Sequence, residues 1–412
     1  MIVMEQTERL LTGPTRASRA DLRARVELAT EWLLRDGISF VDGPAQGAFS
    51  MGYDRRSGQV LPAYTEITGY SVSLLMALGA HTRLPRARER ARKAAAYIGR
   101  VQVKSPDNPK ADGGVVEQTA EGRNFSRLWA FDAAMCGAGL VGLLADEGWE
   151  ENLAVATGLG DWLLNPMQRE DGSFWAAYDL ARRELVSDAL FGHGSCIHAK
   201  HSLFLLRLAK ARGDDRYADA ALKACDYALQ LQDDDGAFWA MPDRAQIFTH
   251  AHCYALEGLI YTHRVSGDER YLAAFRQGIS WLLSAQLRSG GLQQTYRVLR
   301  VLARRVNNWL NPFTATDATA QAIRLWLIAY AMEEGSSYLA AAGRALDFLL
   351  SVQCLETSDA RAKGGFYYGT TRGRPSRYMY TWCTQFAIAA MLAFSEASSG
   401  NASAAEMIDS LF

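Results

Sequence analysis

A repeat runs along the whole chain and restricts its possible folds more than any other feature. Each copy has an amphipathic segment that ends at Gln or in a short polar loop, followed by Gly and an aromatic or apolar residue. The unit occurs six times, and its glycines are Gly47, Gly113, Gly172, Gly236, Gly290 and Gly364. Repetition of one supersecondary unit along a chain indicates a repeat or closed-ring architecture rather than two or three ordinary domains.

Two kinds of helical segment alternate between the copies. Amphipathic segments cover 21–36, 85–103, 150–168, 215–232, 269–287 and 337–353, and more apolar segments cover 65–82, 126–146, 190–212, 249–266, 315–334 and 380–397. A helix with one polar face lies at the surface, whereas a helix that is apolar all round is surrounded by others. The sequence therefore predicts an all-α protein, an (α/α)6 toroid or six-hairpin barrel, with an outer helix first and an inner helix last.

The chain is expected to form one domain, because no Pro-rich or Gly/Ser-rich linker divides it. We expect an N-terminal extension over 1–20, the toroid over 21–398 and a C-terminal tail over 399–412. Gly213 and Gly267, each followed by acidic residues, predict short turns from an inner helix to the next outer helix.

Composition excludes several classes of function. The net charge of -1 gives no electrostatic basis for nucleic-acid binding. No stretch reaches the roughly 18 uninterrupted apolar residues of a transmembrane helix, and residues 1–19 lack the apolar run of a secretory signal. The six cysteines lie mostly within apolar helical patterns, which is typical of reduced, buried thiols. These features predict a cytoplasmic protein; they leave its oligomeric state open.

Polar and aromatic residues gather where the inner helices are expected to begin. Since every long loop leads into an inner helix, these helix N-termini share one face of the ring. The candidates on this face are Tyr64, Glu66, Tyr70, Arg127, Trp129, Asp132, His193, His250, His252, Tyr254, Trp309, Asp317, Arg377, Tyr380 and Trp382. Helix capping accounts for part of this set but not for its convergence on one face. We therefore predict a substrate site there, and helix N-termini would also favour anionic groups.

Two carboxyl groups are the best candidates for acid–base chemistry. Glu66 lies in the first turn of its helix between Tyr64 and Tyr70. Its alternative role is favourable interaction with the helix dipole, whereas aromatic packing would raise its pKa and suit proton transfer. Asp132 lies in an otherwise apolar helix, where an unpaired carboxylate is costly and needs a partner or a substrate.

A second set of residues suits proton abstraction. His250 and Tyr254 are four residues apart and therefore lie on one helical face, where they could act as base and acid. Tyr70 is an alternative partner for His250. With this pair the reaction would be epimerisation or elimination rather than hydrolysis.

The remaining candidates are predicted to bind substrate. Arg127 and Arg377 would orient a uronate or phosphate through bidentate contacts. Asp317 has the alternative of capping its helix. The aromatic and histidine candidates, Tyr64, Trp129, His193, His252, Trp309, Tyr380 and Trp382, suit stacking on a sugar or bonding to its hydroxyls. The spacing around His193 matches no strong zinc pattern, so we predict neither a metal nor a cofactor.

The segment 297–305 is basic and amphipathic and precedes the fifth inner helix. It is either a solvated surface helix or a lid that contacts an anionic substrate or a lipid–water surface. Peripheral membrane contact through 297–305 is therefore one of its predicted roles.

The motifs on this face resemble those of a bacterial group of six-hairpin toroid proteins linked to exopolysaccharide gene clusters. The resemblance spans nearly the whole chain and is carried by 64–70, Phe131-Asp132, the segment 249–259 and Tyr380-Thr381-Trp382. It implies the six-hairpin glycosidase superfamily, which contains hydrolases, sugar epimerases and uronate-processing enzymes. Two motifs depart from the group's pattern: its Asp-Thr-Gly appears here as Asp-Ala-Ala from Asp132, and its Asn-Trp appears as Thr381-Trp382.

Three functional hypotheses follow from the sequence. The leading one is an enzyme that processes an oligosaccharide or glycoconjugate, including a uronate-containing one, by general acid–base chemistry as a hydrolase or a sugar epimerase or lyase. The second is a saccharide-binding or scaffold toroid without catalysis. The third is a terpene-cyclase-like enzyme, because the repeat resembles the Gln-Trp motifs of that class. The acidic run 233–235, however, is expected in a hairpin loop rather than on an inner helix.

Overall fold

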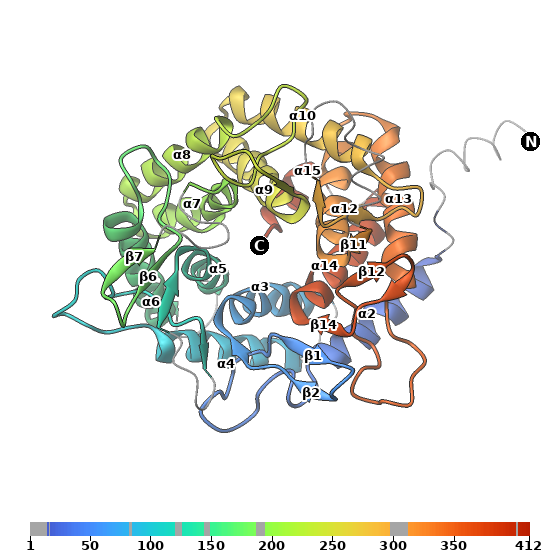
Figure 1. Ribbon diagram of the computed structural model, residues 1–412, viewed down its shortest axis with the longest axis horizontal. Coiled ribbons are helices and arrows are strands. Elements are labelled where there is room, and N and C mark those ends of the chain that lie inside the picture. The colour runs from blue at the N-terminus through green and yellow to red at the C-terminus, as the bar shows by residue number, and fades with distance from the viewer. Residues whose placement is uncertain are drawn as a thin grey trace, which may run out of the picture.

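The computed structural model describes residues 15, 17–81, 85–119, 126–143, 149–186, 194–296, 312–400 and 403–412. They form a ring of helices around a central axis (Figure 1). The inner helices are α3 (Thr65–His81), α5 (Ala130–Val141), α7 (His201–Arg212), α9 (Thr249–Ser266), α12 (Thr316–Ala331) and α14 (Thr381–Ala397). The outer helices are α2 (Arg19–Leu33), α4 (Pro85–Val101), α6 (Trp149–Trp162), α8 (Asp215–Leu229), α10 (Glu269–Ala285) and α13 (Ser336–Ser351).

The ring closes between the two ends of the chain. Each inner helix packs against the next, and α14 packs against α3 to complete the circle. Five hairpins pair an inner helix with the outer helix that follows it, and the sixth pairs the last inner helix, α14, with the first outer helix, α2. The prediction of an (α/α)6 toroid with an outer helix first and an inner helix last is confirmed.

The repeat that predicts the fold also joins the hairpins. The amide nitrogen of Gln168 donates to Gly172 O in its own loop at 3.2 Å and to Ala220 O on the next outer helix at 2.8 Å. Gln102, Gln232, Gln286 and Gln353 make the same pair of bonds. The loop glycine approaches the same neighbour closely: at Gly172, which has φ +87°, a Cβ would lie 2.4 Å from Lys223 O. Gln and Gly are thus needed for the contact between neighbouring hairpins. In the last copy of the repeat, Gln353 donates to Arg25 O on α2, the first outer helix.

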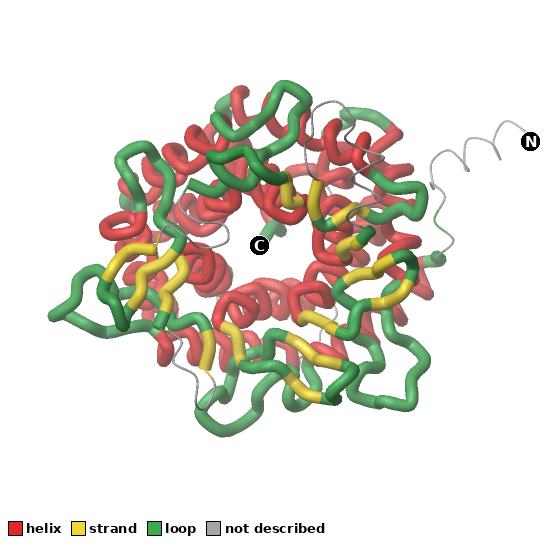
Figure 2. Tube along the Cα trace, viewed as in Figure 1, coloured by secondary structure: helices red, strands yellow, loops and turns green. Residues whose placement is uncertain are grey.

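Short antiparallel strands line the long loops (Figure 2). Two sheets have two strands: β3 (Ala63–Tyr64) pairs with β4 (Gln118–Thr119), and β8 (Ile247–Phe248) pairs with β10 (Thr295–Tyr296). Two sheets have three strands: β1 (Gly52–Asp54) lies between β14 (Tyr378–Tyr380) and β2 (Gln59–Val60), and β6 (Ala177–Asp179) lies between β5 (Arg127–Trp129) and β7 (Glu184–Val186). The fifth sheet has the strand order β13 (Arg374–Pro375), β12 (Gly369–Thr371), β11 (Phe313–Ala315) and β9 (Leu292–Gln293). In register, Gly52 faces Tyr380, so the first and last loops are paired directly.

Two inner helices are shorter than their sequence patterns indicate. Residues 127–129 belong to strand β5, because their backbone pairs with β6 before α5 begins. The third inner helix starts as a 3-10 helix, η2 (Cys196–Lys200), which Ser195 caps, and continues as α7. Among the outer helices, α6 ends in a π-helical turn, η1 (Leu163–Met167), which contains Pro166.

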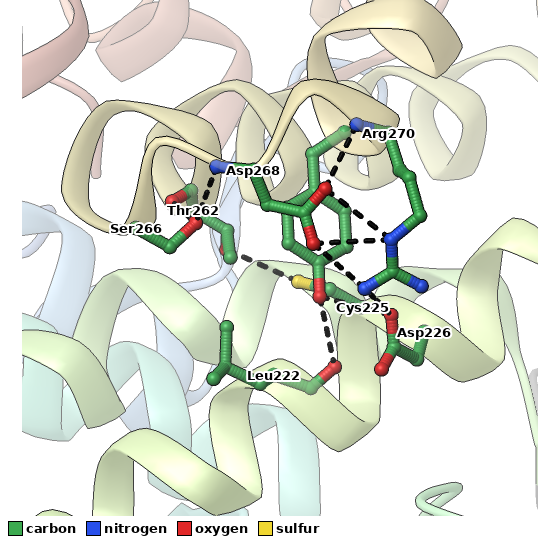
Figure 3. A network of polar contacts seen from close by, with 8 residues as sticks. Leu222, Cys225, Asp226, Thr262, Ser266, Asp268 and Arg270 are labelled. Atoms are coloured by element: carbon green, nitrogen blue, oxygen red, sulfur yellow. Dashed lines mark hydrogen bonds and ion pairs between the residues drawn. The ribbon is translucent and has the colours of Figure 1, made fainter.

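The face opposite the long loops carries the short turns predicted from Gly213 and Gly267. Gly267 adopts a left-handed conformation with φ 73°, and Asp268 then caps α10 by accepting from Arg270 N at 2.9 Å. The Arg270 guanidinium also pairs with Asp226 on α8 at 3.1 Å. This network joins α8, α9 and α10 (Figure 3). The acidic run 233–235 lies in a loop, as expected.

Within the expected C-terminal tail, the side chains of Met407, Ile408, Leu411 and Phe412 are buried against the ring. Helix α15 (Ala404–Asp409) packs against α9 and α12, and the chain ends in the middle of the ring in Figure 1. Leu411 and Phe412 are 1% and 5% exposed. Across the described ranges, no helix is long and apolar enough to span a bilayer.

Candidate active site

The N-termini of the inner helices bring the main candidates to one end of the ring. Glu66, Asp132 and Asp317 each lie in the first turn of their helix, on α3, α5 and α12. His250 is the second residue of α9 and Trp382 the second of α14. The convergence predicted from the order of the long loops is therefore present in the structure.

Glu66, Asp132 and a third carboxyl group, Glu117, interact electrostatically. Burial raises the pKa of Asp132 well above its usual value, and the charges of Glu66 and Glu117 add to this effect. Asp132 is 3% exposed, and its Oδ2 atom has no hydrogen-bond partner among the described residues. The protonated form of Asp132 is therefore favoured over the charged form, compared with an exposed aspartate.

Glu66 has a different environment because it is partly exposed. Burial raises its pKa to about 7 and the charge of Glu117 acts in the same direction, while the Tyr70 hydroxyl and the Lys200 ammonium oppose the shift. Glu66 thus exists in both protonation states near neutral pH. Two interacting carboxyl groups with separate environments are the arrangement that acid–base enzymes use to assign one acid and one base.

Glu117 is not among the candidates predicted from the sequence. Its pKa is also raised by burial, an effect opposed by the side chains of Trp129 and Arg127. Glu117 reaches the site because its backbone oxygen accepts a hydrogen bond from Thr65 N at 2.9 Å, at the start of α3. No local pattern marks this residue, since it lies in an irregular segment whose position depends on that long-range bond.

A buried pair of phenols lies next to the carboxyl groups. Tyr70 donates a hydrogen bond to Tyr254 between their hydroxyl oxygens at 3.1 Å. Burial raises the pKa of both phenols well above the usual value. Tyr64 is partly exposed, and its pKa is raised by burial and by the charges of Asp132 and Glu66. Tyr64 and Tyr70 both interact with Glu66, but the Tyr70 hydroxyl lowers the pKa of Glu66 instead of raising it as expected; burial causes the increase.

Beneath the phenols lies a buried ion pair that sequence reasoning missed. Lys200 and Glu257 are both fully buried, and Lys200 Nζ lies 2.6 Å from Glu257 Oε2. The same ammonium is 4.3 Å from the ring centroid of Tyr254, 5.2 Å from that of Tyr70 and 5.5 Å from that of Phe386. These three rings enclose the cation and provide cation–π contacts.

His250 lies on the other side of Tyr254. Their ring centroids are 5.8 Å apart with an edge-to-face angle of 87°. Burial lowers the pKa of His250, and the charge of Asp317 partly opposes this effect. A lowered pKa makes the imidazole neutral near neutral pH, which is the form that accepts a proton.

An aromatic wall extends from β14 into α14. Tyr380 and Trp382 are stacked with ring centroids 4.2 Å apart, and Tyr378 stacks on Tyr380 at 5.4 Å. Trp382 Nε1 donates to Asp317 Oδ2 at 3.0 Å, so Asp317 fixes the indole in addition to accepting from Ala318 N. The wall is therefore held by a carboxylate rather than by packing alone.

The two arginines predicted to bind an anionic group already have partners. Arg377 pairs with Asp54 at 3.1 Å, and its guanidinium lies 4.4 Å from the ring centroid of Tyr378. Arg127 lies 4.0 Å from Asp179 and 5.8 Å from the ring centroid of Trp129. Both guanidinium groups remain partly exposed, and both flank the end of the ring that holds the carboxyl groups.

His252 differs from its predicted role because it belongs to the core. It is 0% exposed, accepts a hydrogen bond at Nδ1 from Phe238 N at 3.0 Å, and bonds through Nε2 to Gly278 O at 3.1 Å. Both ring nitrogens thus bond within the protein, so the prediction that His252 contacts the substrate is wrong.

His193, Trp309 and 297–305 lie outside the described residues. The described ranges contain no cluster of His, Cys, Asp or Glu suited to a metal ion.

The raised pKa of Glu66 leads to a stability prediction. Because folded Glu66 holds its proton up to a pH of about 7, against 4.5 normally, its stabilising effect is fully present below pH 4.5 and is lost as the pH rises through 7. The full shift corresponds to roughly 3 kcal/mol, which partial exposure of the carboxyl reduces to about 1 to 2 kcal/mol. Glu66→Gln should therefore gain stability relative to the wild type between pH 5 and pH 8. Urea unfolding of the wild type and the variant at pH 5 and at pH 8 measures their difference in stability. If this difference is the same at both pH values, the raised pKa of Glu66 is contradicted.

The same six-hairpin ring occurs in several solved structures. One solved structure, cellobiose 2-epimerase from Bacillus thermoamylovorans, matches with a TM-score of 0.73 and 13% identity over 92% of this chain and 98% of that chain. D-mannose isomerase matches with a TM-score of 0.70 and 13% identity over 92% and 98%. Unsaturated glucuronyl hydrolase from Bacillus sp. GL1 matches with a TM-score of 0.65 and 13% identity over 90% and 96%. No family model and no curated protein sequence matches the chain.

Proposed function

We propose that this protein is a sugar-processing enzyme that transfers protons by general acid–base chemistry at the N-termini of its inner helices. The observation that carries the proposal is the interaction of Asp132 with Glu66: burial and neighbouring charge favour the protonated form of Asp132, whereas the pKa of Glu66 is about 7. A purely structural carboxyl group in a core would be paired. Neither Glu66 nor Asp132 forms an ion pair within the described parts of the chain, which disfavours the non-catalytic scaffold.

Hydrolysis is the reaction that these carboxyl groups support best. The protonated Asp132 would donate its proton to the glycosidic oxygen, and the bond to the leaving sugar would break. Glu66 in its ionised form would assist attack at the anomeric carbon, directly or through water. Glu117 would keep the Asp132 proton in place by adding negative charge beside it.

The substrate would be a saccharide that binds against the aromatic wall. The stacked rings of Tyr380 and Trp382 offer an apolar face to a pyranose ring, and Arg127 and Arg377 would contact an acidic sugar by exchanging their present carboxylate partners. The solved structures of similar fold include enzymes for neutral sugars and one for an unsaturated glucuronide. Both neutral and uronate-containing saccharides are therefore candidate substrates.

Epimerisation is the second candidate reaction, and the position of His250 favours it. The neutral imidazole would abstract a proton from the carbon next to the carbonyl carbon of an open-chain sugar, and Tyr254 would return a proton to the resulting enediol. Two solved structures of similar fold are named as an epimerase and an isomerase. In this reaction Asp132 would act as the acid that protonates the ring oxygen of the sugar, so that the sugar ring opens.

One experiment separates the two reactions and tests the proposal. The protein is incubated in D2O with cellobiose, with mannose and with an unsaturated glucuronyl disaccharide, and the products are followed by NMR. Hydrolysis releases monosaccharides, whereas epimerisation or isomerisation places deuterium on the carbon next to the carbonyl. Conversion that Asp132→Asn abolishes supports the proposal. No conversion and no saccharide binding in calorimetry would overturn it.

The cellular setting forms part of the proposal. A cytoplasmic enzyme of exopolysaccharide biosynthesis would act on a lipid-linked or nucleotide-linked saccharide rather than on mature polysaccharide. Contact of 297–305 with a membrane surface would suit a lipid-linked substrate, since this segment is basic and amphipathic. Sedimentation with anionic vesicles, compared with neutral vesicles, tests that contact.

A further inference from the structure

Residues 403–412, here called the closing segment, lie across the axis of the ring. The segment begins with Ser403, which caps α15 in a capping box with Glu406. The chain then ends at the centre of the ring, as Figures 1 and 2 show. Met407, Ile408, Leu411 and Phe412 are each at most 6% exposed. The closing segment therefore packs its apolar side chains into the core, although its sequence has no repeat to place it there.

Three arginines from three inner helices hold the closing segment. Arg207 on α7 donates to the backbone oxygens of Asp409 and Leu411, each at 2.9 Å. Arg324 on α12 donates to Ser410 O at 3.1 Å, and Arg264 on α9 pairs with the Asp409 carboxylate at 3.6 Å. Hydrogen bonds from charged donors are stronger than neutral ones, so the position of the segment is well determined.

Phe412 extends from this anchored segment toward the candidate active site. Its ring centroid lies 6.0 Å from that of Tyr70 at 61°, and 6.0 Å from that of Phe386 at 18°. The Arg324 guanidinium lies 4.7 Å from the Phe412 ring on another side. Tyr70 and Phe386 are two of the three rings that enclose Lys200, so Phe412 supports that enclosure from beneath.

We propose that the closing segment is a positioning element of the active site, in which Phe412 fixes the ring of Tyr70 and thereby the hydroxyl that bonds to Tyr254. The proposal rests on the proposed function, because it assigns Tyr70 and Tyr254 to a working site. The hydroxyl lies at the far end of the phenol ring, so a small tilt of the side chain about its Cα–Cβ bond moves this oxygen more than any other ring atom and changes its 3.1 Å hydrogen bond. Misplacement by about 1 Å at a reacting group costs up to roughly 100-fold in rate.

Phe412→Ala tests the proposal against a matched control. Phe348 on the outer helix α13 is 7% exposed, close to the 5% of Phe412, and lies outside the site, so Phe348→Ala removes a comparable ring. With the saccharide found in the D2O experiment, Phe412→Ala should lower kcat about tenfold and change KM less than about twofold. Phe412→Leu, which keeps the bulk of the side chain, should restore more than half of kcat. Phe348→Ala should keep kcat within about twofold at a similar loss of stability.

Hydrogen exchange measured by mass spectrometry tests, without a substrate, whether Phe412 holds the Tyr70–Tyr254 pair in place. In Phe412→Ala, peptides from α3 and α9 that contain Tyr70 and Tyr254 should exchange faster than in the wild type. In Phe348→Ala the increase should be confined to α13 and its neighbours. Equal behaviour of the two variants in kcat and exchange would overturn the positioning role. If no saccharide is turned over, the proposed function fails, while the exchange comparison still supports or overturns the contact between Phe412 and the tyrosine pair.

Discussion

Asp132→Asn is expected to lower saccharide turnover by roughly 1000-fold while leaving the fold intact. A general acid contributes about 100-fold to 10 000-fold to rate, and asparagine has no proton acidic enough to replace it. Burial and the charges of Glu66 and Glu117 raise the pKa of Asp132 and so disfavour its charged form, and the neutral amide of asparagine keeps its shape without adding a charge. The variant should therefore unfold at the wild-type temperature or slightly above it. Steady-state kinetics and thermal unfolding at pH 7 measure the two effects.

Cys136→Ser is the matched control for Asp132→Asn. Cys136 lies one turn further along α5, is buried, and donates through Sγ to Thr65 O at 3.3 Å on the neighbouring helix. Serine keeps that donor, so this variant probes a disturbance of the contact between α3 and α5 without removing an acid. It should retain turnover within about threefold. A stable Asp132→Asn protein with full activity would remove Asp132 from the mechanism.

Lys200→Met is expected to cause the largest loss of stability, about 3 to 5 kcal/mol. Removing the ammonium leaves the Glu257 carboxylate fully buried without its partner at 2.6 Å. The cost should decrease as the pH is lowered, because an unpaired buried carboxylate takes up a proton and becomes neutral. Urea unfolding of the wild type and the variant at pH 5 and pH 8 measures both the loss and its dependence on pH.

The double variant Lys200→Met with Glu257→Leu separates the charge effect from the packing effect. Replacement of both partners by apolar side chains of similar size often restores stability, since neither charge of the pair is then left without the other. We expect it to recover most of the loss seen in Lys200→Met. A double variant as unstable as the single one would show that the ammonium acts through its contacts with the three aromatic rings rather than by neutralising Glu257.

The sequence could locate part of the candidate site because that part depends on local order. Glu66, Asp132, His250 and Asp317 each follow a long loop by a few residues, and the repeat determines on which face such positions lie. The same logic fails for His252, whose two ring nitrogens bond to backbone groups of other hairpins. The spacing of residues along a helix shows on which face a side chain lies, but not which backbone groups of neighbouring hairpins bond to that side chain.

The sequence by itself determined the ring: the repeated Gln and Gly, and the alternation of amphipathic and apolar helices, are local patterns that repeat six times. Only the tertiary structure decided what surrounds the acids. Glu117, the Lys200–Glu257 pair and the closing segment reach the site through contacts between residues far apart in the chain, such as Lys200 with Glu257 and Tyr70 with Phe412. The physical reason is that burial and neighbouring charge set the pKa of a carboxyl group, and both depend on which helices meet rather than on the adjacent sequence.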